Sequence, residues 1–157
     1  MTSKNKNKKG FTLIELLVVV AIIGALAAVG VVAYNGYIGA ARENSTKSIH
    51  NGVVKYIANE RGKCALDESA TIMGSLDCDS TAAEIITALT ADTSPLQDKD
   101  PYDGGMAVVG TAPAAGELRG NVVLSDASTA DDQIISFSTT YDKAEAKTLT
   151  SEVTVSE

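Results

Sequence analysis

The feature that most constrains this chain is an apolar block near its N-terminus. Residues 16–41 are 26 consecutive positions without a charged side chain, and the apolar run already begins at Phe11. A helix needs about 20 apolar residues to cross the hydrocarbon core of a bilayer, so the block is long enough to span one. As a helix, residues 11–34 would extend about 36 Å at about 1.5 Å per residue. We therefore expect a membrane segment over residues 11–34 and a globular domain over residues 35–157.

The charged residues are divided in a related way. Four lysines lie within the first ten residues, where there is no acidic side chain. A basic start before an apolar run is typical of an export signal, and because lysine and arginine stay on the cytoplasmic side, the remainder is expected to face outward. Without these four lysines, nine basic residues face 20 acidic ones, a net charge of −11. This acidity disfavours direct binding of nucleic acid, which needs clustered basic side chains.

The sequence contains no signature of catalysis. It has no Walker loop, dinucleotide fingerprint, zinc-binding spacing or kinase motif. His50 is the only histidine among the 157 residues, so a histidine-based catalytic pair or metal cluster would lack partners. We expect His50 to be a solvated helix side chain and the protein not to be an enzyme.

Glu15 is the one charged residue in the apolar run. A carboxylate inside a membrane helix costs about 2.5–3.5 kcal/mol, so it is normally paired or functional. Two interpretations stay open at this point: a tolerated interfacial acid near the end of the run, or a carboxylate that awaits a positive partner. A simple export signal or anchor also stays open, because Ala-Leu-Ala at residues 25–27 could imitate a cleavage site.

The residues around Glu15 resemble a known N-terminal motif. Residues 8–24 read Lys-Lys-Gly-Phe-Thr-Leu-Ile-Glu-Leu-Leu-Val-Val-Val-Ala-Ile-Ile-Gly. This run closely resembles the N-terminus of type IV pilins and of the related pseudopilins of type II secretion. The resemblance implies that a prepilin peptidase cuts between Gly10 and Phe11, which removes residues 1–10 as a leader peptide, and then N-methylates Phe11.

The same resemblance supplies a partner for Glu15. In the family, the matching carboxylate is thought to neutralise the α-amine of a neighbouring subunit, which here would belong to Phe11. Two charges that are each costly in an apolar medium attract strongly there, which favours one axial register. Many pilins carry a proline where this chain has Val32, and proline removes a helical hydrogen bond. We therefore expect the helix to be more continuous than usual, or to loosen at Gly30 and Gly36.

The helical pattern continues past the membrane segment and becomes amphipathic. The apolar stripe consists of Ile49, Val53, Tyr56 and Ile57, and the side chains expected to face elsewhere are Lys47, His50, Lys55 and Glu60. Gly62 is a natural residue to follow the last turn. The sequence predicts one long helix over about residues 11–61, whose second half offers a stripe for a sheet to cover.

Cys64 and Cys78 are the only two cysteines, and both lie in the part expected to face an oxidising compartment. We favour a structural disulfide between them over free or redox-active thiols. Such a bond would close a loop of about 15 residues and contribute about 3 kcal/mol. Many pilins have their disulfide near the C-terminus instead, so no receptor-binding role is carried over to this loop.

An acidic, turn-rich loop follows at residues 96–105 and contains Asp98, Asp100 and Asp103. Their oxygens could bind calcium, but their spacing does not match the EF-hand loop. The segment resembles only loosely the calcium loop of major pseudopilins. A weak calcium site and a solvated turn both stay open, and no other cofactor is expected.

The remaining elements predict an α+β fold. Thr81 and Glu84 form a capping-box pattern ahead of a short helix over about residues 82–91. Four strand-like runs follow at residues 106–109, 121–124, 133–139 and 148–155, and the last alternates apolar and polar side chains as a half-buried strand does. We expect an antiparallel sheet of about four strands packed against the second half of the long helix, which is also the pilin fold.

These expectations favour a structural subunit. The resemblance implies a major type IV pilin that is held in the inner membrane and then polymerised with copies of itself into an extracellular surface filament. It further implies a prepilin peptidase, an inner-membrane assembly platform and minor pilins as partners. The alternative is a pseudopilin of a type II secretion system; the absence of a clear Asp-Pro-Trp-Gly motif and a threonine-rich exterior favour the pilus. A third class, a membrane-anchored periplasmic binding domain, would retain residues 1–10.

Overall fold

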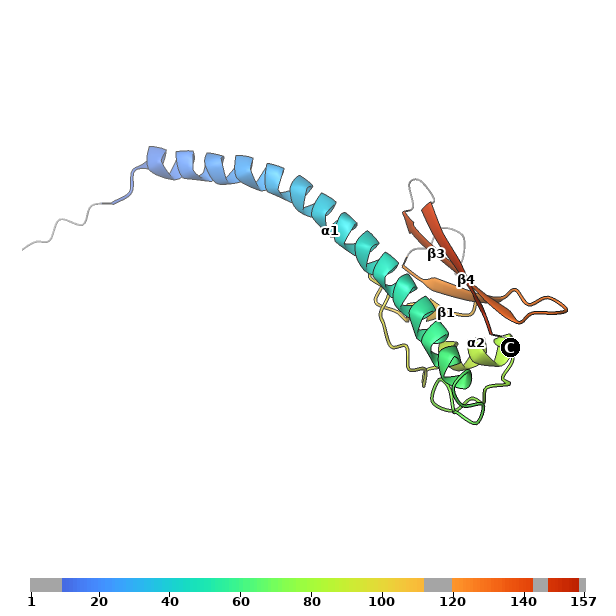
Figure 1. Cartoon of the computed structure of the whole chain (residues 1–157). Coiled ribbons are helices and arrows are strands. Elements are labelled where there is room, and N and C mark those ends of the chain that lie inside the picture. The colour runs from blue at the N-terminus through green and yellow to red at the C-terminus, as the bar shows by residue number, and fades with distance from the viewer. Residues whose placement is uncertain (1–9, 112–119, 143–146, 156–157) are drawn as a thin grey trace, which may run out of the picture. The chain divides into compact units, whose positions relative to one another are not determined.

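The computed structural model describes residues 10–111, 120–142 and 147–155 (Figure 1). Its elements, in chain order, are α1 (Leu13–Cys64), α2 (Ala82–Thr90), β1 (Val108–Val109), β2 (Val122–Asp126), β3 (Ile134–Asp142) and β4 (Lys147–Thr154). The chain divides into two compact units, Met1–Gly39 and Ala40–Glu157, and α1 contributes residues to both. The predicted α+β class is confirmed. Most of the predicted leader peptide, residues 1–9, lies outside the described residues.

Helix α1 has 52 residues and runs without interruption through Gly30 and Gly36. This confirms the more continuous of the two predicted forms. The predicted stop at Gly62 is wrong, because α1 continues to Cys64. Two basic side chains, Arg61 and Lys63, lie in the last turn, where they interact favourably with the helix dipole.

The described part of the first unit is mainly the apolar first half of α1, and its side chains are largely exposed. Phe11 is 88% exposed and Ile23 is 60% exposed. Of the helices in the described residues, α1 is the one long and apolar enough to cross a membrane, and its most apolar 18-residue stretch has no buried residue. In the described structure, this part of α1 therefore does not pack into a hydrophobic core.

The second unit has a conventional hydrophobic core. Its residues come mainly from the second half of α1, from α2, from β1, β2 and β3 and from the disulfide loop, and Val155, just after β4, also belongs to it. Ile57 of α1, Ile85 of α2 and Leu124 of β2 are all fully buried in it. Helix α2 begins at a capping box, in which Thr81 and Glu84 each bond to the other's backbone N–H, as predicted. Burial of these apolar side chains holds both helices against the sheet.

The sheet has the strand order β1-β2-β3-β4. The β2–β3 and β3–β4 pairs are antiparallel, as expected, whereas β1 and β2 are parallel. Parallel neighbours cannot be joined by a tight hairpin and need a connection of about a dozen residues. Residues 110–121 connect β1 to β2. Residues 112–119 of this connection, and residues 143–146 of the predicted β3–β4 connection, lie outside the described residues.

The alternation predicted for the last strand is confirmed. Along β4, Leu149, Ser151 and Val153 are half-buried, and the residues between them are exposed. Ile135 and Phe137 on β3 are fully buried in the core, and Ser138 on the same strand is exposed. One face of the sheet therefore covers the helices, and the opposite face carries mainly hydroxyl groups.

Candidate functional site

The predicted cleavage site lies just before α1 begins. Gly10 and Phe11 are exposed and precede the first helical residue, Leu13. A Cβ added at Gly10 would meet no heavy atom of the described residues within 4 Å. The peptide bond between Gly10 and Phe11 is thus accessible in the described structure.

Thr12 and Glu15 form a second capping box, at the start of α1. The backbone N–H and the hydroxyl of Thr12 both donate to Glu15 Oε2, at 2.8 and 2.7 Å, and the Glu15 N–H donates to Thr12 Oγ1 at 3.3 Å. This reciprocal pattern satisfies backbone donors that a helix start leaves free. Sequence reasoning missed the role of Thr12, although the Thr-x-x-Glu spacing that predicted the Thr81 box occurs here as well.

The two carboxylate oxygens of Glu15 are used differently. Oε2 accepts both donors from Thr12, and Oε1 has no hydrogen-bond partner among the residues that the structure describes. A carboxylate oxygen has two lone-pair positions, so Oε1 can still accept a donor from another chain. The carboxylate therefore caps its own helix and keeps one oxygen available.

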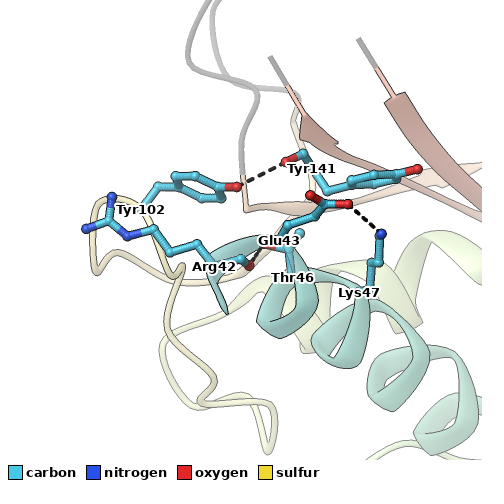
Figure 2. Close-up of polar contacts among 6 residues, drawn as sticks. All are labelled: Arg42, Glu43, Thr46, Lys47, Tyr102 and Tyr141. Atoms are coloured by element: carbon cyan, nitrogen blue, oxygen red, sulfur yellow. Dashed lines mark hydrogen bonds and ion pairs between the residues drawn. The ribbon is translucent and has the colours of Figure 1, made fainter. Parts of the chain in front are cut away.

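A cluster of cations and tyrosines ties α1 to two distant segments in the second unit (Figure 2). The Arg42 guanidinium lies 5.7 Å from the centre of the Tyr102 ring, and the Lys47 ammonium lies 4.2 Å from the centre of the Tyr141 ring. The Tyr102 hydroxyl donates to the backbone oxygen of Tyr141 at 3.0 Å. Lys47 also pairs with Glu43 at 2.6 Å. These contacts attach the start of the covered part of α1 to the 96–105 loop and to β3.

His50 is buried, so the prediction of a solvated histidine is wrong. The side chain is 1% exposed, and its Nδ1 and Nε2 lie 2.9 and 3.0 Å from the hydroxyl oxygens of Thr139 on β3 and Ser151 on β4. The edge of the ring meets Phe137 with 6.4 Å between ring centres. Burial lowers the pKa of His50, because an apolar surrounding disfavours the charged form. His50 therefore links α1 to β3 and β4 through its two ring nitrogens.

Glu60 also faces inward, where an outward position was expected. Its Oε2 accepts the N–H of Met73 at 2.7 Å, and its Oε1 pairs with Lys63 at 2.5 Å. Burial would raise the pKa of the Glu60 carboxyl, but the bonds from Lys63 and Met73 and the Lys63 charge hold it below the ordinary value. Met73 has a φ of +51°, in the left-handed region, so Glu60 fixes a tight turn of the disulfide loop.

The predicted disulfide between Cys64 and Cys78 is present. It joins the last residue of α1 to a point 14 residues later in the chain. Arg61 Nη1 donates to the backbone oxygen of Cys78, which adds a second tie across the same loop. The end of α1 is therefore anchored covalently and by hydrogen bonds.

The three candidate calcium ligands do not form a metal-binding group, and the described residues contain no cluster of three or more His, Cys, Asp or Glu side chains that could hold a metal ion. Asp98 and Asp103 are exposed, and Asp103 Oδ1 accepts the N–H of Gly105. Asp100 is 2% exposed, and its Oδ1 accepts the N–H of Tyr102 at 2.7 Å. Burial raises the pKa of Asp100, against the bond from Tyr102. Calcium binding at this loop stays a prediction.

Gly120 explains how Asp100 comes to be buried. It has a φ of +85°, and a Cβ there would lie 2.0 Å from Asp100 Oδ1. Its N–H donates to the backbone oxygen of Thr140 at 3.2 Å. Only glycine fits this position, because it combines a left-handed backbone with close approach of a carboxylate.

Comparisons with known proteins agree with the motif. The family model for the prokaryotic N-terminal methylation motif matches residues 5–31. The chain is 39% identical over 99 residues to the type IV major fimbrial protein FimA of Dichelobacter nodosus (strain VCS1703A), and the match covers 60% of this chain and 61% of that protein. It is 40% identical over 72 residues to a fimbrial protein of Moraxella nonliquefaciens, covering 45% and 47% of the two chains. No solved structure matches the chain. The predicted relationship to type IV pilins is confirmed, over about three fifths of the first relative's length.

Proposed function

We propose that this relative of the type IV fimbrial proteins is the major structural subunit of a type IV pilus. The precursor is held in the inner membrane, cut between Gly10 and Phe11 and N-methylated at Phe11. The mature chain is then polymerised into a filament on the cell surface. One observation carries this proposal: the first half of α1 is a continuous apolar helix with its side chains exposed.

An apolar surface of this extent cannot remain in water. Exposed apolar patches larger than a few hundred Å² mark sites of interaction with a membrane or with another protein. A bilayer covers the helix before assembly, and the same helices of neighbouring copies cover it in the filament. The two environments are alternatives for one surface, so a membrane pool of subunits can feed a polymer.

The start of α1 supports the assembly step. Cleavage would give Phe11 a free α-amine, one residue before the capping Thr12. In the filament, this amine pairs with the open Oε1 of Glu15 on a neighbouring subunit. In an apolar medium such a pair fixes the axial register of the two helices, because a shift by one turn would leave both charges unpaired.

The proposed life cycle needs other proteins. A prepilin peptidase performs the cleavage and methylation, and an inner-membrane assembly platform with minor pilins adds the subunits. The pseudopilin alternative shares all of these early steps. The similarity to proteins described as fimbrial favours the pilus.

The mass of the chain in sheared surface material tests the proposal. We expect filaments of a chain that begins at Phe11 and carries one added methyl group. Gly10→Val should leave the uncut precursor in the membrane without filaments. Gly62→Val is the matched control, since a Cβ there would meet no heavy atom within 4 Å. Filaments that retain residues 1–10, or cells that make no filament of this chain, would contradict the proposal.

A further inference from the structure

The second unit carries a long segment with acidic side chains only. Residues 65–98 contain seven acidic residues and no basic one. The ion pairs among the described residues are Lys47 with Glu43 and Lys63 with Glu60, so none of those seven carboxylates has an ion-pair partner there. A region with this much uncompensated charge favours a cationic partner.

Two of these carboxylates flank a hollow. It has a volume of about 470 Å³, and Glu68, Asp79, Ser80 and Gln133 are among its lining residues. Arg61 also lines it, but its Nη1 donates to the backbone oxygen of Cys78, and no ion pair joins it to Glu68 or Asp79 in the described structure. The hollow is therefore lined by two carboxylates that have no ion-pair partner among the described residues.

The complementary charge lies on α1. Arg42 lies over the Tyr102 ring, and Lys47 and Lys63 have carboxylate partners. Lys55 is exposed and has no partner among the described residues. Gly52, one helical turn before it, is also exposed, and a Cβ there would meet nothing within 4 Å. Another chain can thus approach the helix closely beside an unpaired lysine.

We propose that Lys55 of one copy enters the hollow of a second copy and pairs there with Glu68 and Asp79. The inference rests on the proposed filament function. Lys55 is not among the residues that line the hollow, so one head-to-tail contact leaves each copy with either its lysine or its hollow free. A heterologous contact of this kind can continue from copy to copy, and it forms an open helical polymer when the rotation between copies does not close a ring.

The pairing acts on register more than on affinity. An exposed ion pair is worth little by itself and is screened by salt. If two second units met in another axial or rotational position, Lys55 would not reach the hollow. The acidic segments of the two copies would then repel each other. The contact therefore selects one arrangement of the second units, while the apolar helices supply most of the adhesion.

Charge reversal and its repair test this contact in cells that carry the full assembly machinery. We expect Lys55→Glu, Glu68→Lys and Asp79→Lys each to reduce the yield of sheared filaments about fivefold or more, the range expected when attraction becomes repulsion. The double variants Lys55→Glu with Glu68→Lys and Lys55→Glu with Asp79→Lys should regain filaments, because the swap restores opposite charges. Misfolding cannot explain such a recovery.

Matched reversals elsewhere control for net charge. Lys99→Glu and Asp92→Lys change exposed residues that do not line the hollow, and they should leave the yield unchanged. The contact is overturned if Lys55→Glu assembles at the wild-type level, or if neither double variant exceeds Lys55→Glu. In both of those results the wild-type filaments still form, so the proposed function stands. Absence of wild-type filaments would instead contradict the function itself.

Discussion

The two halves of α1 have similar helical geometry and opposite surroundings. In the first half, Ile23 is 60% exposed; in the second half, Ile57 is fully buried under the sheet. The same residue type therefore contributes to different equilibria. Ile57 stabilises the fold of one chain, and Ile23 is available to stabilise contacts with lipid or with other chains. The exposed apolar side chains of the first half therefore need a bilayer or other copies of the chain to cover them.

The largest effect is expected from Glu15, the one charge in the first half. Glu15→Val should still insert in the membrane, since an expensive carboxylate is gone. It should give few or no filaments, because the amine of a neighbouring Phe11 loses its partner and a broken buried pair can cost about 3–5 kcal/mol. Filament counts by electron microscopy, with subunit levels from immunoblots, check this.

Glu15→Gln separates charge pairing from helix capping. Glutamine can replace glutamate in a capping box, but it carries no charge. We expect Glu15→Gln to fail in assembly like Glu15→Val, whereas Thr12→Ala, which keeps the charge and loses the box, should retain more filaments. Normal filaments made of Glu15→Gln alone would show that the charge is not what assembly requires.

A matched pair of substitutions tests the division between the halves directly. Ile57→Ala should lower the free energy of unfolding of the second unit by about 2–5 kcal/mol, because it leaves a cavity in the core. Ile23→Ala should leave that free energy unchanged. Urea unfolding of the full chain in detergent, followed by tyrosine fluorescence, measures both, and equal destabilisation by the two variants would remove the distinction.

The disulfide at the end of α1 provides a smaller test. Cys64→Ser should destabilise the second unit by about 3 kcal/mol, the loss expected for a loop of about 15 residues. Insertion of the first half in the membrane should not change. Membrane fractionation and urea unfolding give the two readouts, and a variant that unfolds like the wild type would show that the hydrogen bonds across the loop are sufficient.

The smallest effect is a pH dependence from His50. Its pKa is lowered from 6.5 in the folded chain, so below pH 6.5 the unfolded chain binds a proton that the folded chain resists. Stability should therefore fall as the pH drops below that value, by at most about 1.4 kcal/mol per pH unit from this one group. His50→Gln should remove this part of the slope. The free energy of unfolding of the wild type and of His50→Gln is measured between about pH 5 and about pH 7. If it changes with pH equally in the two proteins, His50 does not contribute.

The sequence predicted those features that depend on local pattern. Hydrophobic periodicity predicted α1 to within a few residues of its ends. The capping-box pattern at Thr81 predicted α2, and the presence of two cysteines predicted the disulfide. The motif at Gly10 and Glu15 pointed to the family.

Features that depend on distant partners were missed. His50 was assigned to the solvent side because polar helix residues usually lie there, and its hydroxyl partners are 89 and 101 residues away in the chain. Glu60 was misplaced for the same reason, since its partner Met73 lies in a turn that no pattern predicts. The parallel direction of β1 depends on the path of a connection and not on the composition of the strand.

The capping box at Thr12 and Glu15 also means that Glu15 is oriented before cleavage takes place. In the uncut precursor, Phe11 is joined to Gly10 and has no α-amine, so Thr12 is the partner that holds Glu15. Under the proposed cleavage, the amine arises one residue away, after the carboxylate has already been oriented. A precursor would then be well folded at its helix start and still incompetent to join a polymer. Proteolysis would thus make the subunit competent for assembly by creating one new charge, without any refolding of the subunit.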